Sequence, residues 1–117
     1  MRVGFIGLGN VGGKLAGTLL RNGTAISVVD LDPAKVAGFT AKGAGTAENP
    51  AALMATCDVV ITCLPRPEIS AAVVEGPGGL LEAMGPGKIW LEMSTTDATE
   101  ITRLGEKVAA AGGAAVD

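Results

Sequence analysis

Three glycines near the N-terminus have the spacing of a phosphate-binding loop. The loop reads G-x-G-x-x-G and consists of Gly7, Leu8, Gly9, Asn10, Val11 and Gly12. An apolar run precedes it and a helix-like stripe of apolar residues follows it, the context in which this pattern predicts a strand, a tight turn and a helix. Gly7 would permit the turn, Gly9 would let a pyrophosphate approach the backbone, and Gly12 would let the helix pack closely. The free N–H groups and the positive end of that helix would then face the phosphates.

The glycine pattern alone is weak evidence, because the chain contains 18 glycines and chance matches are expected. The alternative is a tight strand-to-helix turn that binds nothing. A second feature therefore matters.

A carboxylate follows the second apolar run. Asp30 lies at the end of the run 25–29. A carboxylate there can accept hydrogen bonds from both hydroxyls of an adenosine ribose, and it would repel a 2′-phosphate. The next residue is Leu31 rather than an arginine, so the sequence favours NAD over NADP as the cofactor. The alternative for Asp30 is a solvated carboxylate or a helix cap, although Asp32, directly before Pro33, is the better candidate for capping.

Other kinds of chemistry are excluded or disfavoured by residue type. The chain contains no histidine, so neither a Ser-His-Asp or Cys-His site nor a histidine base is expected within it. Cys57 and Cys63 alone make no metal site, and Cys63 is expected to be a small buried thiol in an apolar strand. A Walker loop would need a hydroxyl residue after Lys14, where Leu15 stands. We therefore expect no metal site and no histidine-based catalysis in this chain.

The composition limits the partners. With 117 residues, of which 48% are hydrophobic, the chain has room for one folded domain with a real core. The net charge of −3 and the lack of any block of Lys or Arg make nucleic acid and anionic membranes poor partners. No apolar run reaches the roughly 18 residues of a membrane span. The N-terminus lacks the pattern of a signal peptide, so we expect a cytoplasmic location.

The glycine loop and Asp30 must be positioned by alternating strands and helices. Strands are expected at 3–6, 25–29, 58–64, 88–93 and 114–116, with a weak one near 44–46. Helices are expected at 10–21 and 33–42, after Pro50, at 68–74, as one turn at 80–84, and from Asp97, which forms a capping pair with Glu100, to 112–113. This alternation predicts an α/β fold: a doubly wound, mainly parallel, six-stranded Rossmann sheet with helices on both faces.

At this point the sequence resembles a known family. The run Val3–Gly12 is similar to the opening of the β-hydroxyacid dehydrogenases, which include 3-hydroxyisobutyrate dehydrogenase, tartronate semialdehyde reductase and, more distantly, 6-phosphogluconate dehydrogenase. Val11 replaces the methionine that is usual in the family, which keeps an apolar helix residue. Asp58–Pro65 resembles the fourth strand and Leu-Pro turn of the family. Met93–Thr95 resembles its Ser-Thr turn, and Gly113–Asp117 the run into its substrate loop.

The resemblance implies roles for these later positions. Leu64 and Pro65 would lie against the adenosine side of the cofactor, and Thr95 would approach the nicotinamide ribose or amide. The alternatives are a plain strand terminator at Pro65 and helix capping by Ser94 and Thr95. Ile69 stands where some members have a polar residue that reaches the cofactor, and we expect no such role of it.

The resemblance also implies a larger protein. In the family the chain continues past Asp117 into a Gly-rich substrate loop and a helical domain that carries the catalytic lysine. None of the lysines here matches that lysine; they are Lys14, Lys35, Lys42, Lys88 and Lys107. Residues 1–117 are therefore expected to be the NAD-binding domain of an oxidoreductase that transfers a hydride between NAD and a small β-hydroxy acid. This domain would bind the cofactor without turnover, would need the rest of the protein to bind substrate, and could self-associate through apolar surface at its last strand.

Two alternatives remain. A stand-alone NAD-sensing regulatory domain would share the glycine loop and Asp30, but it does not require the Leu64-Pro65 and Ser94-Thr95 turns. An NADP-dependent reductase of the same superfamily, of the imine or glyoxylate type, would share the fold, but Asp30 and Leu31 argue against it.

Overall fold

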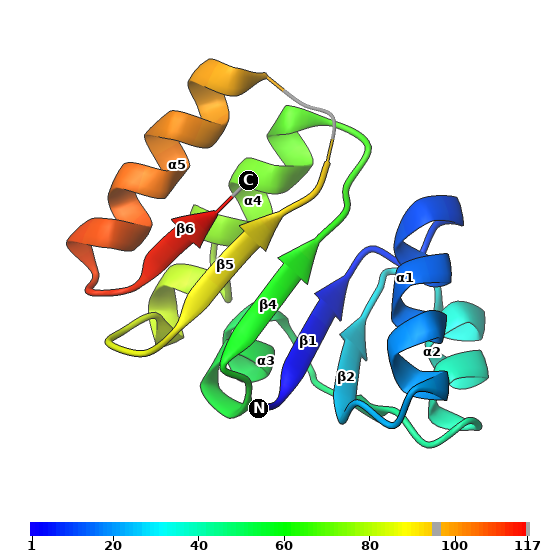
Figure 1. Ribbon diagram of the computed structural model, residues 1–117. Coiled ribbons are helices and arrows are strands. Elements are labelled where there is room, and N and C mark those ends of the chain that lie inside the picture. The colour runs from blue at the N-terminus through cyan, green and yellow to red at the C-terminus, as the bar shows by residue number, and fades with distance from the viewer. Residues whose placement is uncertain (95–96, 117) are drawn as a thin grey trace.

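Within residues 1–94 and 97–116, which the computed structural model describes, six parallel strands form one sheet (Figure 1). Their order is β3-β2-β1-β4-β5-β6. The strands are β1 (Val3–Ile6), β2 (Ile26–Val29), β3 (Gly45–Thr46), β4 (Val59–Thr62), β5 (Ile89–Glu92) and β6 (Ala114–Val116). Every pairing is parallel, so the predicted doubly wound α/β fold is confirmed.

Helices connect the strands and cover both faces of the sheet (Figure 1). They are α1 (Asn10–Arg21), α2 (Pro33–Thr40), α3 (Pro50–Thr56), α4 (Pro67–Glu75) and α5 (Ala98–Ala110), with a 3-10 turn, η1, at Leu80–Ala83. A proline begins α2, α3 and α4, and its fixed φ angle suits the first helical turn. The Asp32 carboxylate accepts a hydrogen bond from the Ala34 N–H, so its predicted role as the cap of α2 is confirmed.

Two buried clusters hold the layers together. The cluster under α1 and α2 includes Phe5, Leu8, Ala16, Val28 and Ile61. The cluster under α3, α4 and α5 includes Leu53, Val60, Val74, Trp90 and Leu104. Neighbouring residues of β4, such as Val60 and Ile61, belong to different clusters because a central parallel strand is buried on both faces. The Trp90 Nε1–H donates to Thr62 Oγ1 at 2.9 Å, so this polar pair in the core is satisfied.

Only one half of the capping pair expected at the start of α5 forms. The Asp97 carboxylate accepts hydrogen bonds from the N–H groups of Thr99 at 2.8 Å and Glu100 at 3.4 Å. The Glu100 carboxylate pairs with the Arg103 guanidinium instead of returning to the cap. A charged partner one turn along the same helix face attracts the carboxylate more strongly than a neutral amide does.

A lysine from another segment caps the C-terminal end of α3. The Lys88 ammonium, at the start of β5, donates hydrogen bonds to the carbonyl oxygens of Met54 at 2.8 Å, Ala55 at 3.3 Å and Cys57 at 2.8 Å. These carbonyls lie at the negative end of the helix, where a cation is favourable. Lys88 therefore joins α3 to β5.

Candidate functional site

The glycine loop lies at the carboxyl edge of the sheet, between β1 and α1 (Figure 1). β1 pairs with β2 on one side and with β4 on the other, so the strand order reverses here. In open α/β sheets, ligands bind in the crevice outside the strand ends at such a point. The predicted residues that follow β1, β2 and β4 are therefore brought to one edge.

The three glycines of the loop differ in what the fold requires of them. Gly7 has a φ of +96°, and a Cβ there would overlap the carbonyl oxygen of Cys63. A Cβ at Gly12 would overlap the carbonyl oxygen of Gly7. A Cβ at Gly9 would meet no atom within 4 Å. Packing within the protein explains Gly7 and Gly12, whereas Gly9 keeps open a space that the fold itself does not need.

The open space lies at the positive end of α1. Gly9 is the N-cap residue of this helix, and no side chain caps the first turn among the described residues. The first-turn amides of Asn10 and Val11 therefore have no side-chain acceptor, and Gly9 and Asn10 are exposed. A phosphate would fit this cradle of amides without obstruction from a Cβ.

Asp30 ties the glycine loop to the end of β2. Its Oδ2 accepts a hydrogen bond from the Leu8 N–H at 2.7 Å, and its Oδ1 accepts one from the Asp32 N–H at 2.8 Å. Each carboxylate oxygen can accept a second hydrogen bond, so ribose hydroxyls can still bind. The Leu8 side chain is buried in the core, and its amide is already engaged by Asp30. Leu8 thus acts on the site by anchoring the loop.

The ends of β4 and β5 are joined by a chain of hydrogen bonds. The Leu64 N–H donates to Ser94 Oγ at 2.5 Å, and the Ser94 N–H donates to Glu92 Oε1 at 2.7 Å. Ser94 therefore braces the Leu64-Pro65 turn. Leu64 is half-buried and Pro65 is exposed at this edge. Thr95, the predicted contact to the nicotinamide end, lies outside the described residues.

Sequence reasoning missed Glu92. Its side chain is only 3% exposed, and its Oε2 has no hydrogen-bond partner among the described residues. The signal in the sequence was an acidic residue inside an otherwise apolar strand. The carboxylate also affects Cys63, which is half-buried rather than buried as predicted because β4 ends before it. Burial raises the pKa of the Cys63 thiol, Glu92 raises that pKa further, and a hydrogen bond from the Gly12 N–H opposes both.

Exposed apolar side chains surround the same edge. Val11 is 60% exposed, Leu31 99% and Met93 45%, and these three follow or border β1, β2 and β5. Exposed apolar side chains at the same edge as a few polar groups are typical of ligand sites. In the described part of the chain, no group of His, Cys, Asp or Glu could hold a metal ion. No helix there is both long and apolar enough to cross a membrane.

Known proteins are similar to this chain in sequence and in fold. A family model described as the NAD binding domain of 6-phosphogluconate dehydrogenase matches residues 2–117. The chain is 34% identical over 112 residues to the cytokine-like nuclear factor N-PAC of Homo sapiens, covering 96% of this chain and 20% of that protein. It is 37% identical over 110 residues to 2-(hydroxymethyl)glutarate dehydrogenase of Eubacterium barkeri, covering 94% and 36%.

Solved structures agree with these relatives. The structure of Psf3 in complex with NADP+ and 2-OPP has a TM-score of 0.90 at 27% identity, covering 97% of this chain and 40% of that one. The 3-hydroxyisobutyrate dehydrogenase of Mycobacterium tuberculosis, with L-serine, has a TM-score of 0.83 at 26% identity, covering 97% and 38%. The chain thus spans well under half the length of the proteins it matches.

Proposed function

Because the chain belongs to the family of NAD-binding domains of 6-phosphogluconate dehydrogenase, we propose that it binds NAD at the carboxyl edge of its sheet. The membership confirms the resemblance seen in the sequence. The observation that carries the proposal is the open space over Gly9, beside the uncapped amides of α1. The fold needs glycine at positions 7 and 12, whereas at position 9 no contact within the protein requires it, and a bound group would occupy the space that it leaves open.

Most of the predicted site residues have a direct role in this proposal, whereas Gly7 and Leu8 shape the glycine loop. The amides of Gly9, Asn10 and Val11 would hold the pyrophosphate, and Gly12 would keep the helix close enough for them to do so. Asp30 would accept hydrogen bonds from the adenosine ribose. Leu31, Leu64 and Pro65 would cover the adenosine, and Thr95 would meet the nicotinamide end. NAD supplies the chemistry of hydride transfer when it is bound, and this chain binds and orients it.

NADP is the second candidate cofactor. One relative of known structure was solved with NADP+. In this chain Lys35 lies on the same surface groove as Leu8, Gly9 and Asn10, so a cation is close to the loop. Against NADP, the Asp30 carboxylate would repel a 2′-phosphate, and exposed Leu31 offers no positive charge. We therefore favour NAD.

The whole protein is proposed to be an NAD-dependent dehydrogenase of a small β-hydroxy acid, with its substrate site and catalytic base outside residues 1–117. The names of two relatives, 2-(hydroxymethyl)glutarate dehydrogenase and 3-hydroxyisobutyrate dehydrogenase, support this substrate class. A dehydrogenase among the relatives also favours an enzyme over a stand-alone NAD-sensing domain. We expect residues 1–117 alone to bind the cofactor without turnover.

The test compares two glycine variants by calorimetric titration with NADH. Gly9→Ala adds a methyl group over the amides, whereas Gly38→Ala adds one on α2; in both places a Cβ meets no atom within 4 Å. We expect Gly9→Ala to weaken NADH binding by about tenfold or more, with an unchanged Tm, because a well-formed phosphate contact is charge-assisted. Gly38→Ala should bind as the wild type does. Equal NADH affinity in all three proteins, or no binding by the wild type, would overturn the proposal.

A further inference from the structure

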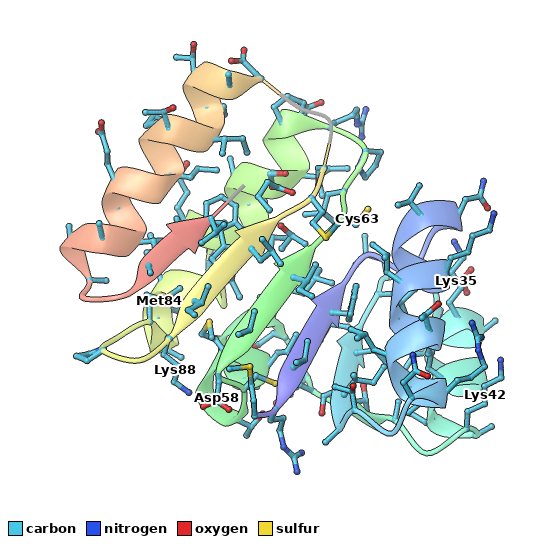
Figure 2. The ribbon with its side chains drawn as sticks, in the orientation of Figure 1. Lys35, Lys42, Asp58, Cys63, Met84 and Lys88 are labelled. Atoms are coloured by element: carbon cyan, nitrogen blue, oxygen red, sulfur yellow. The ribbon has the colours of Figure 1, made fainter. Side chains whose placement is uncertain are left out.

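Four cations that are far apart in the sequence line one surface groove between α1 and α2. Lys14 and Arg21 lie on α1, and Lys35 lies on α2 with Lys42 in the turn that follows it. Figure 2 shows Lys35 and Lys42 on the side of the molecule that carries α1. Lys14 and Arg21 are seven residues apart on α1, which is about two helical turns or roughly 10 Å, whereas Lys42 lies beyond the end of α2 at Thr40. The groove therefore carries two pairs of positive charges.

The floor of the groove is open to a close approach. Gly13 and Gly17 of α1 line it and have no side chain, and Phe39 of α2 adds an apolar wall. The Arg21 guanidinium lies over Gly17, because a Cβ on Gly17 would be 3.4 Å from its Nη1. Its second terminal nitrogen, Nη2, donates to Thr18 Oγ1. The guanidinium is thus held above the groove.

None of the four cations forms an ion pair in the described part of the chain. Its ion pairs involve Arg66, Arg103 and Lys107 instead. All four groove cations are on exposed residues. Their charges are therefore available to an external anion.

The charge of the chain is divided unevenly, which limits what that anion can be. Residues 1–47 contain five Lys or Arg and two acidic residues, a net charge of +3, although the whole chain carries −3. Residues 48–117 therefore carry a net charge of −6. A long polyanion such as duplex DNA would extend past the groove and meet this acidic remainder, whereas a short acidic segment would not.

We propose that the groove between α1 and α2 is a docking site for a short acidic segment of a partner protein. A helical segment with glutamates at positions i and i+7 places its carboxylates about 10 Å apart, which matches the spacing of Lys14 and Arg21 on α1. Its apolar side would cover Phe39. At one end the groove is lined by Leu8, Gly9 and Asn10 of the glycine loop, so it borders the proposed dinucleotide site. The acidic segment would bind at the cations, and this proposal does not depend on the proposed function.

The test uses a labelled synthetic helical peptide of about 15 residues with glutamates at heptad spacing, titrated with the chain at low salt. A peptide of the same composition in scrambled order and a DNA duplex of equal charge serve as comparison ligands. The variants are Arg21→Gln, at the end of α1, and Lys42→Gln, beyond the end of α2, so each changes one cation on one side of the groove. Arg2→Gln is the matched control, since Arg2 is an exposed cation that does not line the groove.

We expect the wild type to prefer the heptad peptide to both comparison ligands. Each groove variant should weaken binding by about two- to fivefold, as loss of one exposed ion pair does, and the double variant should weaken it further. The control should bind unchanged, and equal Tm values would show that all variants fold. Equal binding of the scrambled peptide, unchanged binding by the double variant, or tighter binding of the duplex would overturn the proposal.

Discussion

The Leu8 N–H donates a 2.7 Å hydrogen bond to Oδ2 of Asp30, which joins the glycine loop to the end of β2. The other oxygen of Asp30 receives the N–H of Asp32, the residue that caps α2. One carboxylate therefore fixes the loop and the start of the next helix before any ligand binds. The group proposed to bind the ribose also sets the shape of the proposed phosphate cradle.

The first prediction concerns cofactor preference. Asp30→Asn removes the charge and leaves one acceptor oxygen, so we expect NADH binding to weaken by about tenfold, as loss of a charged hydrogen bond does. Binding of NADPH should weaken less, because repulsion of the 2′-phosphate is also removed. Titration of both nucleotides measures the ratio.

The control for this prediction lies two residues away. Asp32→Asn removes an identical charge and keeps the cap, because asparagine caps helices as well as aspartate does. Its ratio of NADH to NADPH affinity should be close to that of the wild type. If Asp32→Asn shifts the ratio as much as Asp30→Asn does, the loss of any nearby negative charge has the same effect, and Asp30 does not contact the ribose.

The second prediction concerns the glycine at the start of α1 that the fold requires. Gly12→Ala would place a Cβ against the carbonyl oxygen of Gly7 and near Cys63, so α1 must shift away from β4. We expect the free energy of unfolding to fall by about 1–3 kcal/mol, the usual cost of overpacking. Urea denaturation measures it. Gly38→Ala, which meets no atom, should be at least as stable as the wild type. Equal stability of the two variants would contradict this account.

The third prediction is a pH dependence of stability. Hydrogen bonds from Arg103, and then from Lys107, lower the pKa of the Glu75 carboxyl from 4.5 to about 2. A carboxyl with a lowered pKa in the folded state stabilises the fold fully above pH 4.5, and this contribution is lost as the pH falls toward 2. The Tm of Glu75→Gln should therefore be below that of the wild type at neutral pH. The difference should shrink as the solution is acidified through this window.

Glu68→Gln is the matched control for acid sensitivity. Glu68 is a glutamate on the same helix, and its contact with Arg66 is longer, at 3.5 Å, and exposed. The difference in Tm between Glu68→Gln and the wild type should be the same at every pH in this window. A curve for Glu75→Gln that is also parallel would show that the ion-pair cluster does not stabilise the fold.

The fourth prediction concerns Lys88, which caps the C-terminal end of α3. Lys88→Met keeps much of the side chain but removes the ammonium that binds the carbonyls of Met54, Ala55 and Cys57. Loss of these charge-assisted bonds should lower the free energy of unfolding by about 1–2 kcal/mol, measured in urea. Lys35→Met removes an exposed lysine on α2 that caps no helix, and it should change stability little. An equally small effect at Lys88 would show that water replaces the ammonium without cost.

Much of the fold could be predicted because local signals agreed with one another. Pro33, Pro50 and Pro67 each mark the first turn of a helix, and the apolar runs between helices are short enough only for strands. Gly7 and Gly12 could be assigned structural roles in advance because their context, strand then helix, was clear. The roles of Gly9 and Asp30 toward a cofactor remain predictions.

Other features depend on how distant segments meet, and no local pattern reports that. The hydrogen bond from Leu8 to Asp30 follows from the register that pairs Ile6 with Val29, which places the residues after both strands side by side. The gathering of cations follows from the positions of α1 and α2, whose residues line the same groove. In the sequence these cations are isolated, so no block of positive charge was visible. The burial of Glu92 similarly depends on helices that pack over its strand.

The two edges of the sheet are unlike each other. β3 forms one edge and has only two residues, whereas β6 forms the other edge with three exposed residues. A very short edge strand gives an incoming strand little backbone to pair with, but an exposed edge of greater length offers a template. β6 therefore offers an incoming strand a longer exposed edge than β3 does.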